Sequence, residues 1–183
     1  GNVCNGVTSA DSASSLFAYN AILELTGPKG IRQVPIQDFY TGPGKTVRCH
    51  EEVMTAIRIR RRDYEGYTGC YIKYGKRNAM EIATLGCACL VKLSLDKKVV
   101  EDMRIAYGVA APTPVRCPET EKAVSGKAVS KALLLQTGKG VLNEVNPRTS
   151  WRASKEFRLQ LVEELAKRAM AQAIRNGGGE VDA

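Results

Sequence analysis

The chain has 183 residues, of which 44% are hydrophobic and 25% are charged, and its formal net charge is +8 at pH 7. These values fit an ordinary globular protein of one domain or two small ones, and no apolar run approaches the ~20 residues that a membrane-spanning helix needs. The six cysteines include no CxxC pair and His50 is the one histidine, which argues against a zinc site and favours reduced thiols in a cytoplasmic protein.

The basic net charge raises nucleic acid as a candidate partner. The densest basic cluster, residues 58–62, begins with alternating Ile and Arg, which is typical of a half-buried strand with one solvated face. The other cations are dispersed and lack the interleaved aromatic residues that single-strand binders use for stacking. An acidic protein partner is therefore favoured at least as much as nucleic acid.

Residues 1–11 form a polar run rich in Gly and Asn, placed before any long apolar periodicity begins. Gly lets a backbone approach a ligand closely, and Asn, Ser, Thr and Asp supply short donors and acceptors. Such a run can wrap a phosphate, a ribose or a flavin edge. It can equally be an ordinary turn that leads into a helix, and the residues alone leave both readings open.

The first third of the chain predicts a short helix followed by strands. Ser9, Asp11 or Ser12 is the expected helix cap. Gly44-Lys45-Thr46 is similar to the end of a P-loop, but Phe39 stands where the first glycine belongs, so a P-loop is rejected. The expected elements are a helix over 12–19, hairpin strands over 21–26 and 31–36, and a strand over 51–59.

Residues 60–66 are the best linker candidate, because strands and then helices follow them. Strands before helices predict an α+β fold, with a three- to four-stranded antiparallel sheet packed on about three helices. Cys87 and Cys89 are expected to face the core from one side of a strand, and Ser150 to cap the last helix. The expected strands cover 67–74, 83–95 and 99–109, and the expected helices cover 118–126, 127–137 and 151–174.

Four separated segments, in the same order, resemble a known family. They are residues 1–11, Thr41-Gly42-Pro43-Gly44-Lys45, Ala110-Ala111-Pro112-Thr113-Pro114 and the run Ser150 to Arg158. Together they are similar to the FAD-binding subunits of bacterial xanthine dehydrogenases, within the molybdenum hydroxylases. The resemblance implies that residues 1–62 are the C-terminal part of an FAD-binding domain and that residues 63–183 are a CO dehydrogenase flavoprotein C-terminal-like domain.

In this family the opening run is the second of two flavin-binding loops, and the first, a Gly-rich pyrophosphate loop, lies upstream. The resemblance therefore implies the C-terminal portion of a longer subunit, which alone would be inactive and would hold FAD weakly or not at all. Gly1 and Asn2 would lie against the cofactor through backbone and amide, with Cys4 and Asn5 along the same loop. Asp11 would accept a hydrogen bond from the flavin nucleotide, unless it only caps the helix.

The resemblance implies three further cofactor-binding residues beyond the opening run. Val53 and Met54 match an apolar pair that packs on FAD, although a core strand position is the ordinary role of such residues. Lys73 matches a lysine at the cofactor, where a cation favours negative charge, although it can also be a plain solvated residue. An Arg-rich turn of the family corresponds to residues 77–83, with Glu81 in place of its Asp.

The function implied is electron transfer within an oxidoreductase of several subunits. Electrons would pass from the [2Fe-2S] clusters of one partner subunit through FAD to NAD, while a molybdenum-cofactor subunit acts on the substrate. No catalytic residue and no metal ligand is expected in this chain. Two alternatives remain: a subunit-interaction module without flavin, which docks through its basic surface and the helix that follows Trp151, and a basic nucleic-acid-binding domain.

Overall fold

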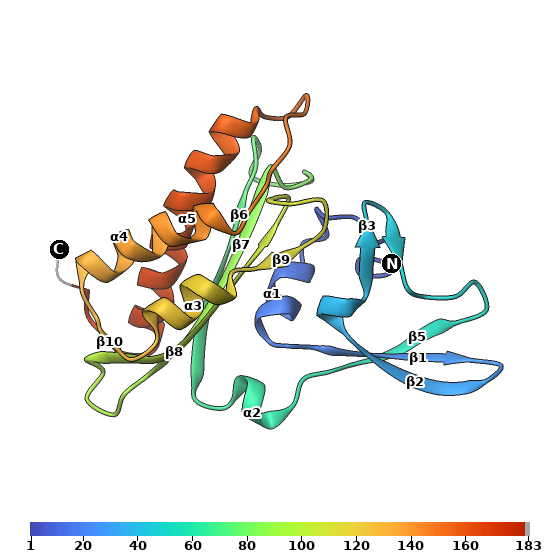
Figure 1. Ribbon diagram of the computed structural model, residues 1–183, viewed down its shortest axis with the longest axis horizontal. Coiled ribbons are helices and arrows are strands. Elements are labelled where there is room, and N and C mark those ends of the chain that lie inside the picture. The colour runs from blue at the N-terminus through green and yellow to red at the C-terminus, as the bar shows by residue number, and fades with distance from the viewer. Residues whose placement is uncertain (182–183) are drawn as a thin grey trace.

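The computed structural model describes residues 1–181 and has an α+β fold built around one antiparallel sheet. The sheet contains three long strands in sequential order, β6 (Tyr67–Tyr74), β7 (Leu85–Leu93) and β8 (Val99–Gly108). Three helices cover one of its faces and the N-terminal part of the chain covers the other (Figure 1). The predicted α+β class is confirmed, whereas the predicted division at residue 62 stays a prediction.

The middle strand β7 is buried on both faces. Cys87 and Cys89 are fully buried in the core under the helices, as predicted, whereas Ala88 and Leu90 point into a second core on the N-terminal side. A sheet covered on both faces needs apolar residues at every position, which explains the continuous apolar run of this strand. Two very short strands extend the edge of β8: β9 (Val115–Arg116) and β10 (Lys127–Ala128).

The helical layer consists of α3 (Pro118–Val124), α4 (Lys131–Gly140) and α5 (Lys155–Asn176), with the short 3-10 turn η2 (Val141–Asn143) after α4. An apolar stripe of residues four positions apart on α5 packs on β6 and β7 and is buried in the core. Its members are Leu161, Leu165, Ala169 and Ala173.

Two predicted helix starts were wrong. The last helix begins at Lys155 rather than at Trp151, because the Ser154 hydroxyl accepts a hydrogen bond from the backbone N–H of Phe157, while Ser150 pairs with Ala153 in an isolated β-bridge. The preceding helix begins at Lys131, because the segment before it is β10. A serine close to a helix start is a weak guide when another serine follows four residues later.

The N-terminal layer contains α1 (Ala13–Ala18) and a three-stranded antiparallel sheet of β2 (Gly30–Pro35), β1 (Ile22–Gly27) and β5 (Val53–Arg58), in that order. The hairpin and the third strand were predicted, and α1 packs against β7 and β8. Three small elements lie between β2 and β5: η1 (Ile36–Asp38), β3 (Tyr40–Gly42) and β4 (Lys45–Thr46).

The expectation that the Ile/Arg alternation marks a half-buried strand was only partly right. The strand exists, but Ile57 is 40% exposed because β5 is an edge strand of a small sheet, and Ile59, 36% exposed, lies beyond the end of the strand at Arg58. Arg58 lies on the solvated side, as expected, and forms an ion pair with Glu24 at 2.6 Å.

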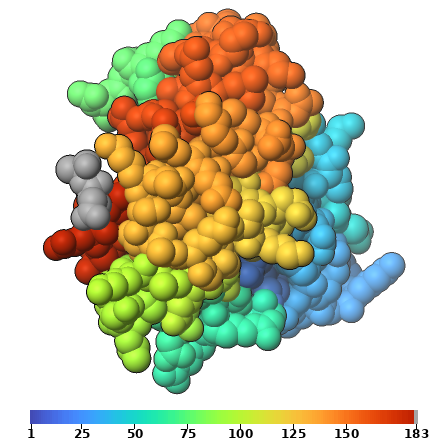
Figure 2. Space-filling view, turned by 60° about the vertical axis from the view of Figure 1, so that its left-hand side comes forward, coloured from blue at the N-terminus to red at the C-terminus, as the bar shows by residue number. Residues whose placement is uncertain are grey.

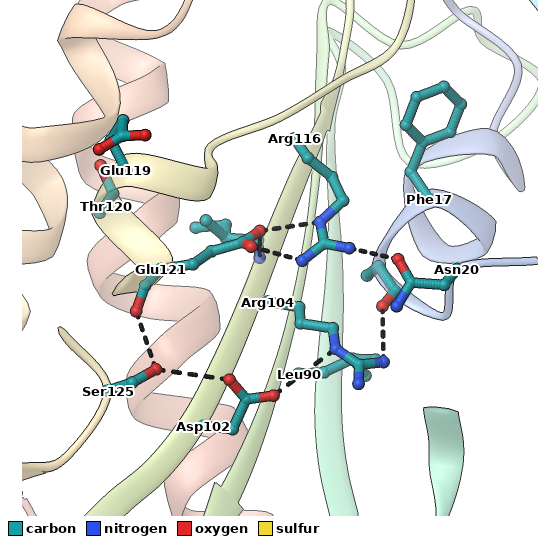
Figure 3. A network of polar contacts seen from close by, with 12 residues as sticks. Phe17, Asn20, Leu90, Asp102, Arg104, Arg116, Glu119, Thr120, Glu121 and Ser125 are labelled. Carbon is teal, nitrogen blue, oxygen red and sulfur yellow. Dashed lines mark hydrogen bonds and ion pairs between the residues drawn. The ribbon is translucent and has the colours of Figure 1, made fainter. Parts of the chain in front are cut away.

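A polar network joins the two layers at the edge of the sheet (Figure 3). Asn20, just after α1, accepts a hydrogen bond from Arg116, which also pairs with Glu121 of α3. The amide of Asn20 donates to Asp63 at 2.9 Å, in the short helix α2 (Arg61–Tyr64) that connects β5 to β6. Within residues 1–181, no helix is long and apolar enough to cross a membrane.

Candidate cofactor-binding site

The polar run at the start of the chain folds into a compact turn beside the N-terminus of α1. The N–H of Asn5 donates to the carbonyl of Gly1 at 3.2 Å, and the N–H of Gly6 donates to the carbonyl of Val3 at 3.1 Å. Asn2 Oδ1 accepts hydrogen bonds from the backbone N–H and the hydroxyl of Ser12, at 3.3 and 2.6 Å. These bonds fix the direction of the Asn2 amide, whose nitrogen remains a donor.

Gly6 explains why the turn needs glycine. Its φ is +66°, and a Cβ there would lie 2.8 Å from the backbone nitrogen of Lys45. Its carbonyl accepts a hydrogen bond from the N–H of Gly44 at 2.9 Å. The loop between β3 and β4 therefore supports the opening turn directly, and two of the four segments that carry the resemblance lie in contact.

Thr8 ties the same run to the far end of the central sheet. Its carbonyl accepts a hydrogen bond from the N–H of Val109 at 3.1 Å, and its hydroxyl donates to the carbonyl of Ala111 at 3.1 Å. Gly108 lies close by, where a Cβ would come within 3.0 Å of the Thr8 carbonyl. Sequence reasoning did not single out Thr8 or Gly108, because no local pattern reveals a contact between residues about a hundred positions apart.

Asp11 and Lys73, two residues predicted for the cofactor site, meet in the structure. The Asp11 carboxylate lies 2.8 Å from the Lys73 ammonium, and both side chains are partly exposed. Asp11 does not cap α1: the N-cap position belongs to Ser12, and no side-chain bond caps it. Burial, and then the Asp11 charge, raise the pKa of the neighbouring Tyr71 to about 12.

Val53 and Met54 take opposite faces of β5. Met54 is half-buried and its sulfur lies 3.9 Å from the sulfur of Cys4, so a second pair of predicted residues meets. Val53 is 66% exposed and pairs across the sheet with Thr26, which in turn pairs with the 67% exposed Ile31. The ordinary core role considered for both residues is therefore wrong for Val53, because successive side chains of a strand alternate faces.

The loop that follows Lys73 encloses a small open hollow of about 300 Å³, lined by residues of segment 73–81. The Glu81 carboxylate accepts a hydrogen bond from the backbone N–H of Arg77 at 2.6 Å, and the Arg77 guanidinium donates to the carbonyl of Met80 at 3.0 Å. Glu81, the acid that stands in place of the family's Asp, thus holds the shape of this turn.

The groups around the opening turn suit a ligand with carbonyl, hydroxyl and phosphate oxygens, such as FAD. Within residues 1–181, the backbone N–H groups of Asn2, Val3 and Cys4 donate to no other group of the chain. Beside them lie the Asn2 amide, the Lys73 ammonium as a cation and the Asp11 carboxylate as an acceptor for a ribose-type hydroxyl. Asn5 is exposed on the same turn. By the chemistry of its donors and acceptors, the site fits the cofactor that the resemblance implies.

Comparison with known families divides the chain into two matched segments. Residues 1–60 match the FAD binding domain in molybdopterin dehydrogenase, and residues 70–173 match the CO dehydrogenase flavoprotein C-terminal domain. The first match contains the opening turn and the pair Val53 and Met54, and the second contains Lys73.

Individual relatives agree with these matches. The xanthine dehydrogenase FAD-binding subunit of Escherichia coli O157:H7 is 42% identical over 99% of this chain and 61% of its own length. The glyceraldehyde dehydrogenase medium chain of Sulfolobus acidocaldarius is 31% identical over 94% of this chain and 61% of its own length. A solved carbon monoxide dehydrogenase of Hydrogenophaga pseudoflava has a TM-score of 0.89 at 28% identity, covering 96% of this chain and 60% of that one. The chain thus spans about three fifths of the length of these proteins.

Proposed function

Because this chain belongs to the family of the CO dehydrogenase flavoprotein C-terminal domain, with a molybdopterin dehydrogenase FAD-binding segment before it, we propose that it forms one wall of an FAD site. The subunit to which this wall belongs would transfer electrons within a molybdenum hydroxylase of the xanthine dehydrogenase type. The 42% identity to a xanthine dehydrogenase FAD-binding subunit supports the xanthine dehydrogenase type over the enzyme types of the less similar relatives.

The opening turn and the strand end at Lys73 would hold the cofactor. Gly1, Asn2, Cys4 and Asn5 offer backbone and amide donors, and Asp11 offers an acceptor. Bound FAD supplies the ability to exchange one or two electrons, and the protein supplies orientation and charge.

Three side chains outside the opening turn complete this proposed wall. Lys73 provides a fixed positive charge, which stabilises negative charge beside it. Met54 keeps an apolar surface behind Cys4, and the exposed Val53 offers apolar surface on the other face of β5. Neither of these two carries a proton or an electron.

The single observation that carries the proposal is the ion pair of Asp11 and Lys73. It joins the opening turn to the central sheet at 2.8 Å, and it brings together two residues 62 positions apart that the family resemblance independently assigns to the cofactor. An exposed pair contributes little to stability, so both groups are available to a ligand.

The remaining parts of the proposed function concern the assembly. We expect a [2Fe-2S] subunit to deliver electrons, a molybdenum-cofactor subunit to act on the substrate, and NAD to accept the electrons, in the cytoplasm. The relatives' names include a xanthine dehydrogenase FAD-binding subunit and medium chains of dehydrogenases, which supports an assembly of several chains.

Visible flavin absorbance per protein chain tests the proposal. We expect the intact subunit, of which residues 1–183 form part, to carry FAD. The double variant Asp11→Asn, Lys73→Met of this subunit should bind FAD at least tenfold more weakly, because it loses charge-assisted hydrogen bonds to the cofactor. The matched control, Asp38→Asn with Lys29→Met, changes an exposed acid and an exposed cation outside the proposed site.

A colourless intact protein that takes up no added FAD would refute the flavin site and favour the interaction module. For residues 1–183 alone we expect weak FAD retention or none. Stoichiometric, tightly held FAD in this chain would contradict that expectation. NADH-dependent bleaching of the flavin in the assembled enzyme tests NAD as the acceptor.

A further inference from the structure

Two loops form a continuous exposed surface at one end of the central sheet. One loop, residues 75–84, follows β6, and the other, residues 145–157, leads into α5. The Lys76 ammonium lies 5.8 Å from the ring centre of Trp151, so the two loops are in contact. Figure 2 shows the green first loop beside the orange start of α5 at this end of the molecule. We call this area the Trp151 surface.

The centre of the Trp151 surface is apolar and unusually exposed. Trp151 is 79% exposed and Met80 is 95% exposed. Tyr74 and Phe157 form an edge-to-face pair with ring centres 5.9 Å apart, and both remain more than a third exposed. Large exposed apolar side chains that gather in one place mark interaction sites, and Trp, Tyr, Phe and Met are enriched in protein interfaces.

Cations dominate the rim of this surface. The Arg152 guanidinium lies 4.2 Å from the ring centre of Trp151. The two loops carry few acids to balance their basic residues. The cations are Lys76, Arg77, Arg148, Arg152 and Lys155, and the acids are Glu81 and Glu156.

Arg158 adds a buried positive charge beneath the same surface. Its side chain is 2% exposed and donates to neutral acceptors, the carbonyl of Thr84 at 3.3 Å, the hydroxyl of Ser150 at 2.8 Å and the carbonyl of Arg148. Among residues 1–181 no carboxylate lies within ion-pair distance of it. Burial, and then Arg148 and Arg152, lower its pKa. A buried charge is normally paired, so this cluster lacks an anion.

We propose that the Trp151 surface docks a partner protein chain through an acidic patch with an apolar side chain at its centre. The partner would place carboxylates against Arg148 and Arg152, above Arg158, and would cover Trp151 and Met80. A second copy of this chain does not fit, because a net charge of +8 would bring like charges together. The inference rests on the proposed function, since the partner is one of the other subunits of the assembly.

Association with the separately purified [2Fe-2S] and molybdenum-cofactor subunits, measured by biolayer interferometry, tests the proposal. We expect Trp151→Ala to weaken binding to one of them by about 30-fold or more, as removal of a central interface residue does. Arg152→Glu should also weaken this binding, and the weakening should be smaller at high salt.

Two matched controls test whether exposure alone matters. Met80→Ser should weaken binding whereas Leu95→Ser should not, although Leu95 is 99% exposed. Lys98→Glu is the charge control on the hairpin after β7.

Hydrogen exchange in the assembled protein supplies the second measurement. Residues 75–84 and 145–157 should be protected relative to the isolated subunit. The proposal would be overturned if the Trp151→Ala and Arg152→Glu variants both bound the partner subunits with an affinity within threefold of that of the unsubstituted protein. Protection from exchange confined to other segments would also overturn it. Binding of a nucleic-acid duplex that depends on Trp151 would overturn it too. Flavin absorbance is read in parallel on every protein. An unsubstituted intact subunit that takes up no FAD refutes the cofactor site, whereas a variant that keeps its flavin and loses association concerns the docking surface alone.

Discussion

Two acidic residues join the N-terminal layer to the rest of the molecule, and they are held in opposite ways. Asp63 is 3% exposed and accepts from Asn20 and Arg60 at 2.9 and 2.8 Å, with Arg104 at 3.4 Å. Asp11 lies at the surface and pairs with Lys73. The first arrangement fixes the architecture, whereas the second leaves a carboxylate and an ammonium free to exchange partners with a ligand. In this chain, burial separates Asp63, which holds the structure, from Asp11, which is proposed to serve a ligand.

Removal of the buried carboxylate should produce the largest effect. Asp63→Ala removes one of the two acids paired with the largely buried Arg104, which stacks 4.4 Å from the ring centre of Tyr67 and keeps Asp102 at 3.6 Å. Breaking a buried pair in this way costs about 3–5 kcal/mol, so urea unfolding should show a loss of about 3 kcal/mol. Asp38→Ala, at an exposed acid, is the control. A loss of unfolding free energy below about 1 kcal/mol in Asp63→Ala would mean that Asp63 stabilises the fold no more than an exposed acid such as Asp11 does.

A smaller effect is expected from Glu52, an acid of the three-stranded sheet region. Hydrogen bonds from Arg32, and then from the backbone N–H of Cys49, lower the pKa of Glu52 to about 2. A lowered folded-state pKa gives stability that is present above about pH 4.3, the unfolded value, and is lost as the pH falls toward 2.

Glu52→Gln should therefore flatten the fall of unfolding free energy with pH between about 4.3 and 2. The measurement is urea unfolding of the variant and the wild type at several pH values in this window. Parallel curves for the two proteins would show that Glu52 gains nothing from Arg32. Glu52 would then resemble Asp11 more than Asp63.

The sequence predicts the scaffold better than it predicts the contacts. Apolar runs and turn residues locate β6, β7 and β8 within two residues at each end, because local preference and burial agree there. They cannot reveal that Thr8 bonds to Ala111, that Asn20 links Arg116 to Asp63, or that Arg158 lies buried without an acid. These contacts depend on how distant segments pack. The family resemblance assigned Asp11 and Lys73 to the same cofactor, but neither it nor any local pattern predicted the ion pair between them.

The smallest stability effect is expected at the candidate cofactor site, and it is the sharpest test of the difference between Asp63 and Asp11. Asp11→Asn with Lys73→Met removes an exposed pair, so the free energy of unfolding should change by less than about 0.5 kcal/mol in the flavin-free protein. The same variant should lose flavin, because both groups are proposed ligands. A structural role would give the opposite result, with a loss of stability comparable to that of Asp63→Ala and unchanged flavin content. Urea unfolding and flavin absorbance on one preparation separate the two roles, because a charge that serves a ligand does not affect the unfolding free energy until the ligand is bound.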